Sequence, residues 1–364
     1  MAEVRDNILS IRSVPPYIRS GDSISRIMWT FITVLILPCI YSVYLFGFHA
    51  ALILAACVIS AVLSGTFFRL LLKREVRIFN GASVITGLLV GMNVPPDIPV
   101  WIPVTGTVFA VIIVRELYGG TGHNIFNPAL AGRAFMMASW PIYMTSFRHI
   151  TIPGNGLAVS ETIPKELFDV ITQATPLTVM KEGTRIAGEL NIPFETIYNS
   201  LMNKSMIKAL VAGNTGGCIG ETSALLLLAG ALILLWRKII TWHIPVTFIG
   251  TVALAFYIYY SLIGSSYPGY ITLIHVLSGG LIMGAFFMAT DMVTSPLSGR
   301  GKLIFGMGCG IITFIIRLKG GYVEGVCYAI LIMNAVVPLI DRFLKPAVFG
   351  YSRDITDQQV QASK

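Results

Sequence analysis

Apolar runs long enough to cross a lipid bilayer recur along this chain of 364 residues. Apolar residues make up 55% of the sequence and charged residues only 12%, about half the charged share of a soluble domain. About 20 apolar residues span the hydrocarbon core, where backbone groups must be paired within helices or closed barrels. The sequence therefore predicts an all-α polytopic membrane protein with about ten transmembrane helices.

Ten predicted helices account for the apolar runs, and three of them are short. They cover residues 28–46, 50–71, 80–93, 100–117, 125–140, 220–236, 242–263, 271–291, 303–316 and 321–340. Glycine or proline interrupts several runs, and a membrane tolerates such breaks only where the freed backbone groups are buried in protein or line a cavity. We therefore expect some broken helices. The first 26 residues are polar and basic, so no signal peptide is expected.

Lysine and arginine gather in loops that lie on one face of such a protein. They are Arg5, Arg12, Arg19, Arg26, Arg69, Lys73, Arg74, Arg77, Arg115, Arg237, Lys238, Arg300, Lys302, Arg342 and Lys345. The positive-inside rule assigns this face to the cytoplasm, here of a bacterial inner membrane, with both termini on it. Arg317 and Lys319 are the exception. The net charge of +8 thus reflects membrane topology, and we expect lipid but no nucleic acid as a partner.

The two halves of the chain resemble each other weakly. "TGLLVGMNVPP" aligns with the start of "SGGLIMGAFFMATDMVTSP", so that Gly87, Leu88 and Gly91 match Gly280, Leu281 and Gly284. Five spans in each half place the halves in opposite orientations. The prediction is two inverted five-helix repeats with a central site where broken helices meet. The expected parts are a cytoplasmic tail (1–27), a first repeat (28–140), an extracytoplasmic polar segment (141–212), a second repeat (213–345) and a cytoplasmic tail (346–364).

The segment "VAGNTGGCIGETSALLLL", residues 211–228, is rich in glycine and polar groups directly before the sixth span. Its glycines are Gly213, Gly216, Gly217 and Gly220, and Glu221, Thr222 and Ser223 are expected in the first helical turn. Helix capping explains one or two polar residues but not the glycines, which let a bulky ligand approach the backbone. A helix N-terminus also favours phosphate. The pattern indicates a phosphate-bearing ligand at the outer membrane surface, with capping as the alternative.

Three separated motifs occur in an order that is typical of one family. The stretches "YGGTGHNIFNPALAGRAF", "GNTGGCIGETSALLLL" and "FFMATDMVTSP" resemble the RnfD subunits of Rnf complexes and, more distantly, the NqrB subunits of sodium-pumping NADH:quinone reductases. The resemblance covers nearly all of the chain. The short N-terminal tail favours RnfD, because NqrB chains usually carry a longer N-terminal extension.

The resemblance implies a membrane electron-transfer subunit of an ion-translocating ferredoxin:NAD+ oxidoreductase, coupled to Na+ or H+ transport and not catalytic alone. Its implied partners are RnfA, RnfB, RnfC, RnfE, RnfG and a flavin transferase that attaches FMN to a threonine through a phosphoester. The match to the family's Gly-Glu-Thr makes Thr222 the acceptor. Ser223 is the competing hydroxyl, and Gly216, Gly217, Gly220 and Glu221 complete the motif. A second, non-covalent flavin, riboflavin or FMN, is expected between helices.

Three polar residues in the spans are further candidates for cofactor binding. Asp291 ends the eighth span, where a carboxylate is a functional candidate for an ion path or a second flavin; the alternative is pairing with Arg300 at the interface. Arg133 is expected to hold a flavin phosphate or ring oxygen, or to pair with a carboxylate. Asn127 precedes Pro128 and breaks the fifth span, which suits a cavity.

Motifs for metal binding and hydrolysis are not expected. The five cysteines form no CxxC pair and are interpreted as packing residues, although Cys218 leaves a thiol near the flavin motif. His123 and His275 lack ligand spacing. Without a Walker loop or a Rossmann unit, NAD is expected to bind another subunit. The rival function is a channel or secondary transporter of the same inverted-repeat design without a redox cofactor, for which a flavin acceptor has no use.

Overall fold

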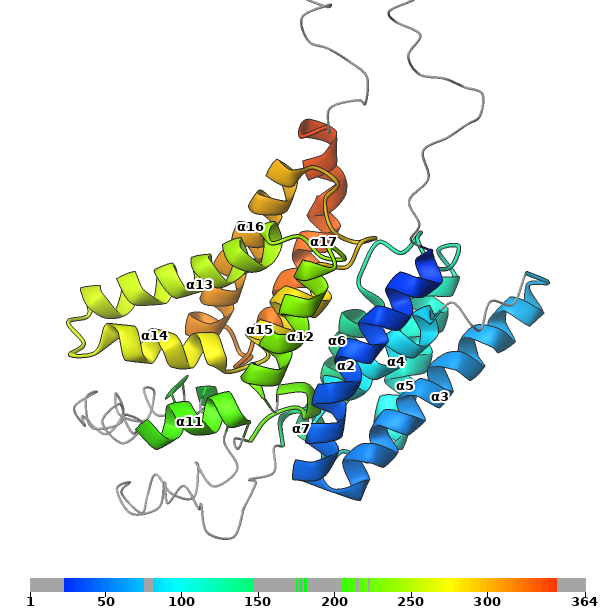
Figure 1. Cartoon of the computed structure of the whole chain (residues 1–364), viewed down its shortest axis with the longest axis horizontal. Coiled ribbons are helices and arrows are strands. Elements are labelled where there is room, and N and C mark those ends of the chain that lie inside the picture. The colour runs from blue at the N-terminus through cyan, green and yellow to red at the C-terminus, as the bar shows by residue number, and fades with distance from the viewer. Residues whose placement is uncertain are drawn as a thin grey trace, which may run out of the picture.

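The computed structural model describes residues 23–74, 81–146, 175, 177–178, 180–181, 204–213, 216–221 and 223–345. In these ranges every regular element is a helix (Figure 1). The first half contains α2 (Ile24–Phe46), α3 (Phe48–Leu71), α4 (Ala82–Met92), α5 (Trp101–Phe109), the π-helix η2 (Ala110–Glu116), α6 (Pro128–Ser139) and α7 (Pro141–Thr145). The second half contains α11 (Lys204–Ala212), the 3-10 helix η4 (Ile219–Glu221), α12 (Ala224–Trp236), α13 (His243–Leu262), α14 (Pro268–Leu277), α15 (Leu281–Met283), the π-helix η5 (Gly284–Met288), α16 (Gly299–Lys319) and α17 (Val326–Phe343).

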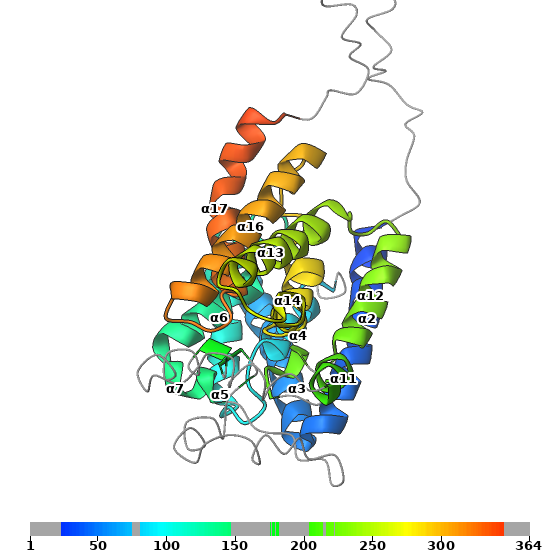
Figure 2. The same ribbon diagram turned by 90° about the vertical axis from the view of Figure 1, so that its left-hand side faces the viewer.

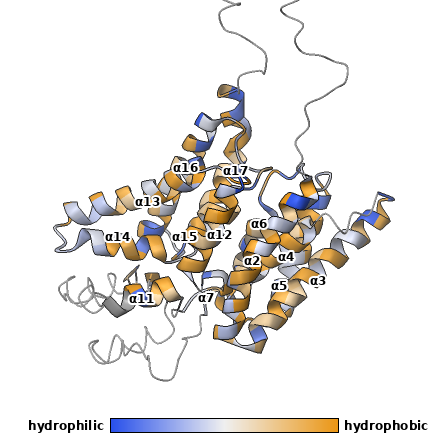
Figure 3. Cartoon of the chain, viewed as in Figure 1, coloured by the Kyte–Doolittle hydropathy of each residue, from blue (hydrophilic) through white to orange (hydrophobic). Residues whose placement is uncertain are grey.

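A helix lies at each of the ten predicted spans, and their lengths differ. The helices α2, α3, α13, α16 and α17 are long and apolar enough to cross a membrane, and α14 with α15 and η5 forms a sixth candidate. The apolar helices α4 and α12 are shorter, with 11 and 13 residues. Apolar side chains cover much of the outer surface (Figure 3), as at Phe67, Trp236 and Leu262. A surface of this kind is suited to lipid, and the chain is a polytopic membrane protein.

The ninth span is longer than predicted. The expected range 303–316 becomes a helix of 21 residues, because the serine at its start and the basic residues at both ends belong to the helix. Ser298 is its N-cap and accepts a hydrogen bond from the Gly301 backbone N–H at 3.0 Å. Arg300, Lys302, Arg317 and Lys319 therefore lie within α16.

The eighth span is broken in the middle. Gly279 and Gly280 have positive φ angles of 68° and 63°, and the axis bends by 61° between α14 and α15. The Arg317 guanidinium closes the end of α14 by donating to the carbonyl oxygens of His275, Ser278 (3.1 Å) and Gly279 (3.4 Å). Arg317 is only 4% exposed. Its exception to the positive-inside pattern thus has a structural reason, because this charge serves a helix end inside the protein.

The packing of the two halves follows one pattern. In the first half α3 packs against α4 and α5, and in the second half α13 packs against α14 and α16. The halves meet where α2 contacts α12 and where α6 contacts α17. In Figure 1, α2 and α12 run in opposite directions. Contacts between equivalent elements, with reversed direction, are what two inverted repeats produce.

Two opposite faces can be distinguished. Figures 1 and 2 place the start of α2 and the end of α17 at the same side, and α7 and α11 at the other side. We call the first the termini face and the second the α7 face. The return of the chain to its starting side fits an even number of crossings.

Candidate functional site

The glycine-rich segment ends where α12 begins. Ser223 has an extended backbone and is the N-cap of α12, so its Oγ accepts a hydrogen bond from the Leu226 N–H at 3.3 Å. The same hydroxyl donates to the Val211 carbonyl at 3.2 Å. The expectation that residues 221–223 form the first helical turn is wrong for Glu221 and Ser223, because this cap starts the helix at Ala224. Thr222 lies outside the described residues.

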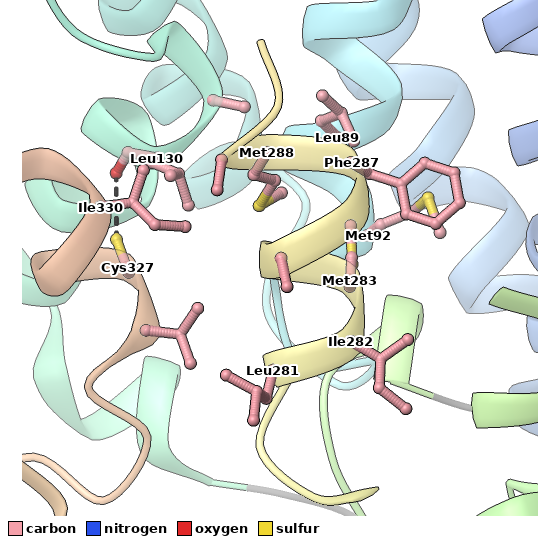
Figure 4. Close-up of a cluster of buried hydrophobic side chains, with 14 of the residues drawn as sticks. Leu89, Met92, Leu130, Leu281, Ile282, Met283, Phe287, Met288, Cys327 and Ile330 are labelled. Atoms are coloured by element: carbon pink, nitrogen blue, oxygen red, sulfur yellow. Dashed lines mark hydrogen bonds between the residues drawn. The ribbon is translucent and has the colours of Figure 1, made fainter. Parts of the chain in front are cut away.

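Close packing requires two of the predicted glycines. A Cβ at Gly220 would lie 2.5 Å from Met283 Sδ and 2.8 Å from Met92 Cβ. Figure 4 shows Met92 and Met283 close to each other beside α15 and η5. A Cβ at Gly217 would lie 2.8 Å from a carboxylate oxygen of Glu221. These glycines bring the segment against the centre of the molecule and make room for that carboxylate, and Gly216 is half-buried before them.

A charged cluster lies on the inner side of this segment. Arg133 of α6 is 5% exposed and forms an ion pair with Glu324. Its guanidinium also donates to Asn93 Oδ1 at 3.1 Å and to Cys218 Sγ at 3.5 Å. Glu221 faces the same group, since one oxygen of each carboxylate and the Cys218 sulfur all lie within 4.8 Å of one another. Arg133 therefore pairs with a carboxylate, as one of its two predicted roles stated.

Sequence reasoning missed Glu324, which lies in the turn between α16 and α17. Its backbone carbonyl accepts a hydrogen bond from Arg317 Nε at 2.9 Å, so the turn is tied to the broken helix. The signal in the sequence was a single carboxylate in the glycine-rich stretch "KGGYVEG" between two apolar runs. Carboxylates next to spans are functional candidates, and this reason for choosing Asp291 holds equally for Glu324.

A separate cavity of about 110 Å³ opens towards the termini face. It is lined by the start of α2 and α4, the ends of η2 and η5, and the loop before α6; its polar lining residues include Thr86, Arg115, Thr121, Asn124, Asn127 and Asp291. Phe31 and Phe287 meet edge to face at 5.7 Å in its wall. An apolar cavity with a few converging polar groups is the usual form of a small-molecule site.

Asp291 lies three residues beyond the end of η5, in the wall of this cavity. Its Oδ2 accepts a hydrogen bond from Thr294 Oγ1 at 3.1 Å, and the predicted alternative of an Arg300 ion pair is not formed in the described part of the chain. Burial raises the pKa of the Asp291 carboxyl, and the hydrogen bond from Thr294 lowers it in part. Asp291 is thus a buried carboxyl with a ligand-sized space beside it.

Asn127 joins this cavity to the start of α6. Its Oδ1 accepts hydrogen bonds from Ala129 N at 3.0 Å and Leu130 N at 3.3 Å, which makes it the N-cap of the helix. Its Nδ2 donates to the Met288 carbonyl at 3.1 Å. On the other side, Asn93 Nδ2 contacts Met288 Sδ at 3.6 Å. The predicted residues therefore divide into two sites, the charged cluster with Arg133 and Glu221 and the cavity with Asn127 and Asp291, separated by Met288.

An ion-pair network closes one side of the cavity. The Arg69 Nε atom donates to Glu116 Oε2 at 3.0 Å, and Arg115 Nε donates to Glu116 Oε1 at 3.1 Å. Arg115 also donates to Ser83 Oγ at 2.9 Å and is 3% exposed. Sequence reasoning used Arg69 and Arg115 only as topology markers, and their contact with Glu116 is a long-range feature of the fold.

The fold and these sites define a class: an α-helical polytopic membrane protein whose broken helices surround a buried charged cluster and a separate apolar cavity. The profile of the NQR2, RnfD, RnfE family matches residues 11–350. The chain belongs to this family.

Full-length relatives give the comparison more detail, and each of the three below carries the letter D in the naming of its complex. The chain is 40% identical to this component of the proton-translocating ferredoxin:NAD(+) oxidoreductase complex of Clostridium ljungdahlii, over 97% of this chain and 99% of that one. It is 39% identical to that of the Na(+)-translocating ferredoxin:NAD(+) oxidoreductase complex of Acetobacterium woodii, over 94% and 95%. It is 35% identical to that of the ion-translocating oxidoreductase complex of Yersinia enterocolitica, over 93% and 97%.

Proposed function

We propose that this chain is the membrane electron-transfer subunit of an ion-translocating ferredoxin:NAD+ oxidoreductase complex and carries FMN on Thr222. The observation that carries the proposal is similarity along the whole chain to relatives that are each named as the same component of an ion-translocating oxidoreductase complex. Its partners are the other subunits, RnfA, RnfB, RnfC, RnfE and RnfG, and a flavin transferase. The membrane is the bacterial inner membrane, with the termini face cytoplasmic and the flavin motif on the outer face.

The choice of Thr222 over Ser223 has support from the structure around them. The Ser223 hydroxyl is 3% exposed and both donates and accepts a hydrogen bond at the start of α12. Phosphorylation of this oxygen by a flavin transferase would remove the cap. A phosphate on residue 222 stands next to the helix N-terminus, where backbone N–H groups and the helix dipole favour negative charge. FMN bound there supplies the redox chemistry, and the protein supplies position and electrostatics.

For the second, non-covalent flavin we propose the cavity at Asp291 and Asn127. Its wall combines the aromatic rings of Phe31 and Phe287 with polar groups at one end. Thr121 Oγ1 is buried there and has no hydrogen-bond partner in the described part of the chain. An unsatisfied hydroxyl beside an apolar space fits a planar ring system with a polar edge. Arg133 is engaged by Glu324 and Asn93 away from this cavity, so we assign it to the charged cluster.

Flavin fluorescence on a denaturing gel tests the covalent attachment. The full chain is produced with its flavin transferase, denatured and illuminated. The wild-type band is expected to fluoresce, Thr222→Val to be dark, and Ser223→Ala to fluoresce because it removes only the helix cap. A dark wild-type band contradicts the proposal and supports the flavin-free channel or transporter, whose broken helices this chain shares.

A further inference from the structure

We propose that Glu221 and Glu324 form a carboxyl–carboxylate pair that holds one exchangeable proton beside the flavin attachment position. The inference deepens the proposed function and rests on it in one respect: the attachment position is the residue that follows Glu221. The proton-holding pair itself consists only of side chains of this chain.

The geometry of the pair requires a proton. The two carboxyl groups lie within hydrogen-bonding reach of each other, and Cys218 Sγ lies within 4.8 Å of an oxygen of each. Two ionised carboxylates offer only acceptor atoms and repel each other at this distance. A pair that shares one proton replaces this repulsion by a charge-assisted hydrogen bond. One proton on the pair is therefore the favourable state.

The surroundings decide which carboxyl carries the proton. Glu324 forms the ion pair with Arg133, and its side chain is 15% exposed, so it is the carboxylate. Glu221 Oε1 is buried without a hydrogen-bond partner among the described residues, and a Cβ at Gly280 would lie 3.0 Å from it. Burial first, and then the negative charge of Glu324, raise the pKa of Glu221 to about 8. The proton therefore resides on Glu221 at neutral pH.

The other charged groups around the pair leave a positive balance. Arg133 faces it from α6 and Arg317 from α16, while the thiols of Cys218 and Cys327 face the cluster from the glycine-rich segment and α17. With Glu324 ionised and Glu221 neutral, two guanidinium groups meet one carboxylate. A net positive charge at this position suits the phosphate expected at residue 222. This complementarity would be lost if both glutamates were ionised.

A route for exchange lies on the α7 face. Glu324 and Arg133 line a cavity of about 120 Å³ together with Thr178, Tyr322 and Tyr328. A proton from water in this cavity binds a Glu324 oxygen, and the shared hydrogen bond then passes a proton to Glu221. The reverse movement releases it, and no other reactant is needed.

Infrared spectroscopy of the purified full chain, produced without flavin transferase, tests the pair. A protonated carboxyl has a C=O stretching band that a carboxylate lacks. We expect such a band in the wild type at neutral pH and its loss as the pH rises through about 8. Glu221→Gln removes the band. Glu324→Gln also removes it, because the remaining Glu221 carboxyl then pairs with Arg133 in its ionised form.

Two carboxyl variants serve as controls. Asp291→Asn removes a buried carboxyl at the other site and Asp97→Asn an exposed one, so both are expected to retain the titrating band of the pair. A band that survives in Glu221→Gln, or that survives in Glu324→Gln, overturns the sharing of a proton. If Glu221→Gln does not fold, Glu221→Asp replaces it and is expected to shift the midpoint of the titration, and an unchanged midpoint counts against the pair.

The position beside the flavin is tested separately. Attached FMN adds a negative phosphate, which stabilises the proton on the pair, so the titration midpoint is expected at higher pH in flavin-loaded wild type than in Thr222→Val. Equal midpoints in the fluorescent and the non-fluorescent sample contradict the placement beside the flavin. A dark wild-type gel band instead contradicts the proposed function and leaves the infrared result on the flavin-free chain unaffected.

Discussion

Arg133 shows at the residue scale how the centre of this molecule holds charge inside a membrane protein. Its guanidinium contacts a carboxylate, an amide and a thiol from three different parts of the chain. A buried charge of this kind is costly unless its hydrogen-bond donors are satisfied. The three partners therefore have to be in place before α6 can lie between the two halves.

Loss of one partner is expected to cost more than loss of both. Arg133→Gln leaves Glu324 buried without its cation and should lower the free energy of unfolding by about 3–5 kcal/mol. The double variant Arg133→Gln with Glu324→Gln should recover much of this loss. Thermal unfolding in detergent measures both, with the exposed Arg300→Gln as a control of small effect. Equal destabilisation by the single and double variants would show that the pair is not coupled.

The stability of the chain should depend on pH through Glu221. Its pKa in the folded chain is raised to about 8, from an ordinary value near 4.5, so the folded state binds a proton that the unfolded state has released. The stability that this proton contributes is complete below the ordinary pKa and is lost as the pH rises to about 8. Melting temperatures across this window should fall in the wild type, and Glu221→Gln should flatten that part of the profile. A profile unchanged in the variant would assign the pH dependence to another group.

At the scale of the elements, local patterns and long-range contacts differ in what they reveal. The apolar periodicity located ten helices, and the glycines of the eighth span indicated its break, because both are properties of short stretches. The placement of η4 could not be predicted in this way. It depends on the methionines of α4 and α15, far away in the chain, and the partner of Glu221 comes from the turn before α17. The sequence therefore indicated the site residues Arg133 and Glu221 without showing that they meet at Glu324.

The packing of η4 can be tested with one methyl group. Gly220→Ala places a Cβ within 2.5–2.8 Å of Met283 and Met92, so η4 has to move away from α4 and α15. We expect destabilisation of about 1–3 kcal/mol and weaker flavin attachment. The matched control is Gly250→Ala in α13, where a Cβ meets nothing within 4 Å and helix propensity favours alanine. Comparable melting temperatures for the two variants would contradict the close packing.

At the scale of the whole molecule, two sites lie on opposite sides of the broken helix. The cavity with Asp291 opens towards the termini face, and the cavity with Glu324 is lined by α7, on the other face (Figures 1 and 2). Asn93 contacts both Arg133 and Met288, and Asn127 contacts Met288 from the far side. Two inverted halves thus bring one polar site to each face and leave a short interior between them. For a redox subunit, this arrangement suits one flavin on each side.

Mass spectrometry of the peptide that contains residue 222 decides whether this chain is a covalent flavoprotein. The full chain is produced with and without its flavin transferase and digested. With the transferase, we expect a peptide heavier by one FMN less one water, with the added mass on Thr222 and none on Ser223. An unmodified peptide from the chain produced with active transferase would contradict the assignment of this protein as a covalent flavoprotein.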